Sequence, residues 1–161
     1  MILIPIGDRF ALIDDEDSDL LSLKWHALSR SNTTYAKRNG QQTAGVREKN
    51  EYLHVVIARR IGIRGQVDHR NRLGLDCRRE NLRSATGSQN TANQAIDNTN
   101  TSGYKGVSLH CQRCGKWTAK IEVNGNKEHI GTFAKASDAA LAYNNRALKA
   151  WGEFAVINRL D

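Results

Sequence analysis

A polar segment divides the chain into two parts, and this division constrains the fold more than any other feature of the sequence. The segment "NQAIDNTNTSG" occupies residues 93–103 and offers almost no side chain that a hydrophobic core could bury. On both sides of it, apolar residues recur with the spacing of strands or helices. We therefore expect two units, residues 1–94 and residues 102–161, joined by a polar linker at residues 95–101.

The size and composition are those of a globular protein. A chain of 161 residues can form one ordinary domain or two small ones. A single proline and 39% hydrophobic residues argue against disorder. No apolar run approaches the roughly 18 residues of a membrane span, and the opening "MILIPIG" lacks the basic start of a secretory signal. We therefore expect a cytoplasmic protein with no membrane partner.

The net charge of +7 is distributed unevenly along the chain. Residues 54–94 carry eight basic residues against three acidic ones, and all eight are arginine. Residues 102–161 carry nine against five, whereas residues 1–53 carry seven against eight. Basic clusters on two segments favour a polyanion that both segments touch. Arginine favours phosphate because its planar fork can bind phosphate with two hydrogen bonds; the alternative is a charge that only maintains solubility.

The pattern of residues 1–94 predicts short strands and short helices. In chain order we expect a strand at 10–14, an acidic connector or short helix, a strand through Trp25, a strand at 34–39, a helix at 53–61 ended by Gly62, a strand at 65–69, a long turn at 70–80, a strand at 81–85, and a small helix through Asn90 capped by Thr86 or Ser88.

The residues around His69 have the chemistry that phosphodiester hydrolysis needs. His69, with an ordinary pKa near ~6.5, can be neutral and accept a proton from an attacking water. Asp68 and Asn90 can supply the oxygen ligands that a hard divalent ion prefers. Neighbouring strand residues point to opposite faces, so Asp68 and His69 share a site only if the strand ends or twists there.

The run "VDHRNRLGLDCRRENLRSATGSQNTAN" resembles the HNH motif of phage and intron homing endonucleases. The matching positions are Asp68, His69, Asn71, Asp76, Arg79, Asn81, Leu82, Arg83, Gln89 and Asn90. The resemblance implies a ββα-metal unit in which His69 is the general base and Asp68 and Asn90 bind the metal. Asn81 would tie the intervening loop and orient the backbone of His69. Arg70, Arg72 and Cys77 depart from the family pattern without removing a catalytic group.

The same resemblance implies one divalent metal ion, Mg²⁺ or alternatively Mn²⁺, and a bacterial or phage-infected host cell. DNA contacts in this unit would come from arginines of the motif, which are Arg70, Arg72, Arg78, Arg79 and Arg83. His54 precedes the motif on the expected helix and could approach the cleft, but a packing or capping role is favoured.

Residues 102–161 have a different pattern, that of a small α+β unit. Strands are expected at 104–110, 115–124 and 128–134, with a hairpin turn at "NGNK". A helix at 137–152 would open with Ser137 as its cap and end at Gly152. Along the central strand Trp117, Ala119, Ile121 and Val123 would form the core face and Lys116, Thr118, Lys120 and Glu122 the polar face.

The pieces "YKGV", "GKWTAKI", "IGTF" and "DAALAYNNRA" resemble the DNA-binding domain of plant ethylene-response factors, the Apetala type. The resemblance spans residues 104–158 and implies a three-stranded antiparallel sheet packed on one helix, with its other face in the DNA major groove. The DNA contacts it implies are Lys105, Lys116, Lys120, Glu122, Lys127, His129 and Thr132. The polar linker could then also be a strap that follows DNA.

The segment "HCQRCG" carries half of a zinc site in Cys111 and Cys114, and His110 or Cys77 would be the candidates to complete it. We interpret the two cysteines as hairpin-loop residues and leave zinc as the alternative. The odd number of cysteines predicts no disulfide framework.

Together these features predict a metal-dependent DNA endonuclease, a homing or nicking enzyme, with double-stranded DNA as partner and no obligatory protein partner. The alternative is a DNA-binding regulator whose nuclease centre is vestigial. An RNA-binding protein fits the charge but offers few aromatic residues for stacking on unpaired bases. We further expect the acidic run "DDEDSD" to face away from nucleic acid.

Overall fold

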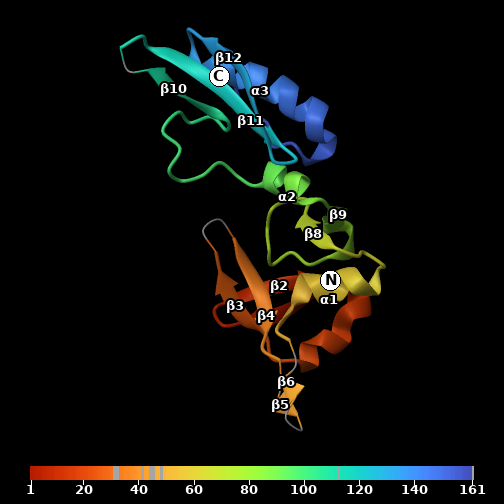
Figure 1. Cartoon of the computed structure of the whole chain (residues 1–161). Coiled ribbons are helices and arrows are strands. Elements are labelled where there is room, and N and C mark those ends of the chain that lie inside the picture. Colours follow the sequence, from red (N-terminus) through yellow and green to blue (C-terminus); the bar gives the residue numbers. More distant parts are fainter. Residues whose placement is uncertain (31–32, 41, 44–45, 48, 112, 161) are drawn as a thin grey trace. The chain divides into compact units, whose positions relative to one another are not determined.

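The computed structural model describes residues 1–30, 33–40, 42–43, 46–47, 49–111 and 113–160, and forms two compact units, Met1–Ala85 and Thr86–Asp161 (Figure 1). Within those ranges no helix is both long enough and apolar enough to span a membrane.

The first unit is built from short antiparallel strand pairs and one α-helix (Figure 1). In chain order its elements are β1 (Ile2–Ile6), β2 (Arg9–Ile13), the 3₁₀ helix η1 (Asp15–Ser22), β3 (His26–Ser29), β4 (Thr34–Arg38), β5 (Gln42–Thr43), β6 (Val46–Arg47), β7 (Glu51–Tyr52), α1 (Leu53–Arg60), β8 (Gln66–His69), η2 (Arg79–Asn81) and β9 (Leu82–Ala85). The sheets have the orders β1-β2, β3-β4-β7, β5-β6 and β8-β9.

Two features of this unit differ from what the residue pattern predicts. The opening residues Ile2–Ile6 form β1, a strand that was not expected. The strand expected through Trp25 begins only at His26. Trp25 is instead buried in the core and donates its indole N–H to the carbonyl oxygen of Leu20 at 3.0 Å. That oxygen lies in η1, so of the two alternatives for the acidic stretch the short helix is the one present.

Helix α1 ends where Gly62 was expected to end it. The N–H of Gly62 donates to the carbonyl of Arg59 at 3.1 Å, and that of Ile63 to the carbonyl of Ala58 at 2.8 Å. This pair of bonds is a Schellman motif, and it requires a left-handed residue, which Gly62 supplies with φ +79°. The helix buries Leu53, Ile57 and Ala58 in the core.

The second unit is a three-stranded antiparallel sheet with a helix packed on one face (Figure 1). Its elements are α2 (Gly87–Asn93), β10 (Val107–Cys111), β11 (Lys116–Val123), β12 (Asn126–Phe133), α3 (Ala136–Trp151) and η3 (Gly152–Phe154), and the strand order is β10-β11-β12. Asn124 and Gly125, with φ of 52° and 81°, form the β11–β12 turn, a conformation that suits a two-residue hairpin.

The core of this unit lies between α3 and the sheet. Its fully buried residues are Val107, Ala119, Ile121, Ala139, Ala140, Tyr143 and Ala147. Small alanine side chains let the helix approach the sheet closely. Ser137 does not cap α3, because the helix begins at Ala136 with Lys135 as its cap residue and without a side-chain cap bond.

The boundary between the units falls after Ala85, whereas the residue pattern predicts it after residue 94. The reason is that α2 packs against elements of the second unit. The indole N–H of Trp151 donates to the hydroxyl of Ser88 at 2.9 Å, and the ammonium of Lys105 donates to the carbonyl of Ala92 at 2.6 Å. Sequence periodicity alone does not report these long-range contacts.

The polar residues expected as a linker are also organised by hydrogen bonds. The side-chain oxygen of Asn100 accepts the N–H groups of Ser102 and Gly103, at 3.0 and 2.8 Å, and its amide donates to the carbonyl of Tyr104 at 2.9 Å. Asp97 accepts the N–H of Thr99 at 2.8 Å. The segment therefore forms defined turns of the second unit.

Candidate functional sites

Asp68 and His69 lie buried at the end of β8. In the β8–β9 pair Asp68 faces Arg83 and His69 faces Leu82. The guanidinium Nε of Arg83 donates to Asp68 Oδ2 at 2.8 Å, and both of these side chains are less than a tenth exposed. The strand ends at His69, where the N–H of Arg72 donates to the His69 carbonyl at 2.9 Å and closes a turn.

His69 is neutral at physiological pH. Burial lowers the pKa of its imidazole to about 4, although the carboxylates of Asp68 and Asp76 act in the opposite direction. Because the carboxylate of Asp68 influences the ring, the two side chains share one electrostatic environment. A neutral imidazole has a lone pair that can accept a proton.

Asn81 fastens the loop between β8 and β9 at several points. Its amide nitrogen donates to the carbonyl of Asp76 at 2.7 Å and to Asn71 Oδ1 at 3.0 Å. Its side-chain oxygen accepts the N–H of Asn71 at 3.0 Å, and its backbone oxygen accepts the N–H of Arg70 at 2.9 Å. Arg70 directly follows His69, so these bonds fix the chain immediately after the histidine.

The structure adds His54 to this region, a residue that the sequence analysis left outside the site. The ring centroids of His54 and His69 are 4.9 Å apart, with an interplanar angle of 66°. Tyr35 lies 5.3 Å from His54 and 5.9 Å from His69. We call His54, His69 and Tyr35 the ring cluster.

Burial and the nearby His69 lower the pKa of His54 to about 3, so both imidazoles are uncharged. Within the described part of the chain, Nδ1 of His54 is buried and has no hydrogen-bond partner. The sequence signal for this position was weak, because a histidine near the start of an amphipathic helix is commonly a packing residue. Its proximity to His69 arises only when α1 packs against β8 and β9.

Arginines expected to contact DNA divide into two groups. Arg78 donates to Asp76 through Nε at 2.8 Å, and Arg79 donates to the fully buried Asp17 through Nε at 2.9 Å. Arg83 is itself buried on Asp68. Internal carboxylates thus hold these three arginines, and their role as DNA contacts stays a prediction. Arg70 and Arg72, by contrast, are exposed.

The acidic run before Trp25 supplies many of those carboxylates. Asp17 accepts from Arg60 at 3.0 Å as well as from Arg79, and Asp19 accepts two bonds from Arg60, each of 2.7 Å. Asp14 accepts the backbone N–H of Arg79 at 2.7 Å. The run therefore neutralises arginines inside the unit. Whether it faces away from nucleic acid stays a prediction.

Asn90, the second expected metal ligand, lies half-buried on α2 in the second unit. Helix α2 begins with a capping box in which Thr86 accepts the N–H of Gln89 at 3.2 Å, so Thr86 rather than Ser88 is the cap. Over the ranges that the structure describes, no three His, Cys, Asp or Glu residues are arranged to hold a metal ion.

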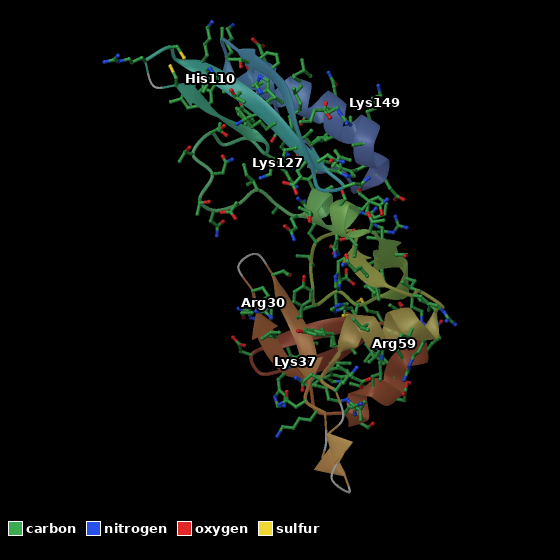
Figure 2. The ribbon with its side chains drawn as sticks, viewed as in Figure 1. Arg30, Lys37, Arg59, His110, Lys127 and Lys149 are labelled. Atoms are coloured by element: carbon green, nitrogen blue, oxygen red, sulfur yellow. The ribbon has the colours of Figure 1, made fainter. Side chains whose placement is uncertain are left out.

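The exposed face of the second unit's sheet is polar and carries three lysines and one glutamate. Its exposed residues include Lys116, Lys120, Glu122, Lys127, His129 and Thr132. Across strands β11 and β12, Lys120 faces His129 and Glu122 faces Lys127. Figure 2 shows Lys127 on this sheet and Lys149 on helix α3.

Two residues expected to be free to contact DNA have hydrogen-bond partners within this unit. Thr118 is only 2% exposed, and its hydroxyl lies 3.0 Å from Nδ1 of His110. The ammonium of Lys105 donates to the carbonyls of Ala92 and Gln94, each at 2.6 Å, at the end of α2, and its role as a DNA contact stays a prediction. A lysine whose ammonium donates hydrogen bonds to the last carbonyls of a helix stabilises that helix end.

The cysteines are also placed by the structure. Cys111 and Cys114 are exposed thiols near the β10–β11 turn, whereas Cys77 is completely buried in the core of the first unit. Burial raises the pKa of the Cys77 thiol. Cys77 is therefore unsuited to complete a zinc site with the other two.

Comparison with known proteins identifies relatives for part of the chain. A segment of 57 residues is 47% identical to the AP2-like ethylene-responsive transcription factor AIL7 of Arabidopsis thaliana, covering 34% of this chain and 11% of that protein. The AP2-like ethylene-responsive transcription factor CRL5 of Oryza sativa subsp. japonica is 46% identical over 57 residues, 34% of this chain and 9% of that protein. The AP2-like ethylene-responsive transcription factor PLT2 of Arabidopsis thaliana is 45% identical over 64 residues, 36% of this chain and 11% of that protein.

The chain thus spans about a tenth of the length of these relatives. The expected resemblance to ethylene-response factors is confirmed at this level. No family model matches the chain, and the resemblance to HNH nucleases stays a prediction.

Proposed function

We propose that the chain binds double-stranded DNA through the exposed face of the β10–β11–β12 sheet. The observation that carries this proposal is the two-sided sheet: one face is buried on α3, and the other presents Lys116, Lys120, Lys127 and His129 to solvent. The similarity to proteins named as transcription factors supports it.

The geometry of such a sheet suits the major groove, which admits a two-stranded β-ribbon. The lysines are suited to phosphates, which fix the position of the protein on the duplex. The Glu122–Lys127 and Lys120–His129 pairs lie side by side across β11 and β12. Glu122 is a hydrogen-bond acceptor, and the amino group of cytosine is the matching donor in that groove.

Replacing Lys120 and Lys127 by glutamine tests this proposal. Each lost phosphate contact should reduce the slope of log affinity against log salt by about 1. Lys149→Gln, which removes the same charge from exposed α3, is the matched control and should leave the slope unchanged. Equal effects of all three changes would show that only net charge matters and would refute the assignment of this face.

A second candidate function is hydrolysis of the bound DNA by the first unit, as in HNH endonucleases. The observation that favours it is the buried, neutral His69 beside Asp68 and His54. We infer that His69 accepts the proton of an attacking water. An approaching phosphate anion would raise the pKa of the imidazole from its low value and make it a better base.

In this second proposal Asn81 fixes the position of His69, and Asp68 supplies the carboxylate of the centre. Asn81 holds the loop after His69 and so fixes the backbone of the histidine. Asp68 is the buried carboxylate of the centre, and one of its oxygens is bound by Arg83. This donor set fits Mg²⁺ or Mn²⁺, because Mg²⁺ binds through one or two carboxylates and keeps water and substrate oxygens as its other ligands. When bound, the ion would stabilise negative charge on the phosphate.

Plasmid relaxation separates the two functions. Wild-type protein with Mg²⁺ should convert supercoiled plasmid into relaxed circles, and His69→Ala should abolish this while DNA affinity is unchanged. His26→Ala, which removes an exposed imidazole from β3, is the control. A wild-type protein that shifts DNA in a gel but relaxes no plasmid with either Mg²⁺ or Mn²⁺ would favour the DNA-binding regulator with a vestigial centre.

A further inference from the structure

The two exposed cysteines of the second unit are close enough to act together. The N–H of Cys114 donates to Sγ of Cys111 at 3.0 Å, and Sγ of Cys114 lies 3.5 Å from the carbonyl oxygen of Cys111. The N–H of Gly115 donates to the same carbonyl at 3.2 Å and closes a turn there. Gly115 has φ +61° and so supplies the left-handed residue of this turn.

Reactivity of a cysteine depends on its thiolate form, because only the thiolate is nucleophilic. A hydrogen bond from Cys111 and the backbone N–H of Lys116 lower the pKa of Cys114. Both side chains are exposed, so that a small molecule can reach them. The buried Cys77 lacks all of these properties.

We propose that Cys111 and Cys114 form a reversible modification site, a dithiol that closes to a disulfide by exchange with small-molecule disulfides of the glutathione class. The Cys114 thiolate attacks one sulfur of the small disulfide, forms a mixed disulfide and releases one small thiolate. The Cys111 thiolate then attacks Cys114 Sγ and releases the second. The two protein thiols lose two electrons, the small disulfide gains them, and the two thiol protons pass to the released thiolates.

The position of the site connects it to the DNA-binding face, and this part rests on the proposed function. Cys111 faces Lys116 across the β10–β11 pair, and Arg113 and Lys116 are both exposed beside it. His110, labelled in Figure 2, precedes Cys111 at the same end of the sheet. Closing a disulfide pulls the two strand ends together and shifts the cationic side chains that they carry.

Thiol titration tests the chemistry without reference to DNA. In native protein a thiol reagent should label two cysteines, and the third should react only after denaturation, since Cys77 is buried. Incubation with oxidised glutathione should remove both reactive thiols together, lower the mass by two hydrogens, and be reversed by dithiothreitol. Cys111→Ser should instead retain a mixed disulfide at Cys114, because the resolving thiol is absent.

A stable mixed disulfide on the wild type, a cross-linked dimer, or absence of reaction would overturn the proposal. Stoichiometric zinc that co-purifies with the wild type and is lost in Cys114→Ser would overturn it in favour of a metal site.

A DNA-binding measurement tests the link to the DNA-binding face. The oxidised wild type should bind DNA about threefold to tenfold more weakly than the reduced protein, the loss expected for about one phosphate contact. The DNA affinity of the double variant Cys111→Ser/Cys114→Ser should not respond to oxidant. Equal affinity of both forms would refute that link. If the reduced protein does not bind DNA, the proposed function fails, while the thiol titration still decides the disulfide.

Discussion

The imidazole of His54 lies edge-on against that of His69, with ring centroids 4.9 Å apart, although fifteen positions separate the two residues in the sequence. Helix α1 thereby contributes a side chain to the centre at the end of β8. The contact gives His54 a place in the proposed hydrolysis, as a residue that positions the ring of His69.

Replacing His54 by alanine should lower plasmid nicking about tenfold, because a ring of His69 that is held less firmly is less often in line with the attacking water. His54→Phe preserves the ring packing and should restore most of the activity. DNA affinity should be unchanged in both variants. If the phenylalanine variant is as inactive as the alanine variant, packing of the ring is not the contribution of His54.

Asp17→Asn should destabilise the first unit by about 2 kcal/mol at neutral pH. It removes a buried carboxylate that compensates Arg60 and Arg79, and the partial exposure of both arginines keeps the cost below that of a fully buried pair. Chemical denaturation of wild type and variant measures the difference, with Asp15→Asn, at an exposed position, as the control.

The same aspartate should make stability depend on pH. Burial raises the pKa of Asp17, but the hydrogen bonds and charges of Arg79 and Arg60 outweigh burial and hold it below its ordinary value of 3.8. Because the pKa of Asp17 is lower in the folded state, its stabilisation is fully present when the pH is above the pKa of the unfolded state. The stabilisation is lost as the pH falls through the pKa of the folded state. The difference between wild type and Asp17→Asn should therefore shrink below about pH 4. A constant difference down to pH 2 would contradict this.

Gly106→Ala should destabilise the second unit by about 3 kcal/mol or more. Gly106 has φ +73°, and an added Cβ would lie 2.1 Å from the Tyr143 ring on α3. Gly103→Ala is a matched control, because Gly103 has a similar φ of +76° but nothing within 4 Å of the added carbon. It should cost only about 1 kcal/mol. Equal melting temperatures of the two variants would show that the ring moves away without cost.

Arg72→Gln should change DNA binding, whereas Arg79→Gln should change stability. Arg72 is exposed, so its loss should weaken DNA binding and reduce the salt slope by about 1 without lowering the melting temperature. The guanidinium of Arg79 donates two hydrogen bonds to Asp17, so its loss should lower stability and leave the salt slope nearly unchanged. The reverse result would mean that the internal ion pairs open when DNA binds.

Local signals in the sequence were sufficient for several elements. Gly62 after an apolar run predicted the end of α1, and "NGNK" predicted the β11–β12 turn. Alternation placed Ala119 and Ile121 in the core and Lys120 and Glu122 outside it. Such features depend on neighbouring residues only, since backbone propensity and side-chain direction act over a few positions.

The sequence by itself therefore determined the end of α1, the β11–β12 turn and the two faces of β11. Only the tertiary structure decided which arginines remain exposed, that α2 packs with the second unit, and that His54 meets His69. These outcomes depend on contacts between residues far apart in the chain, such as Arg79 with Asp17 and Trp151 with Ser88. No local pattern encodes them, because a side chain's partner is fixed by how whole elements pack.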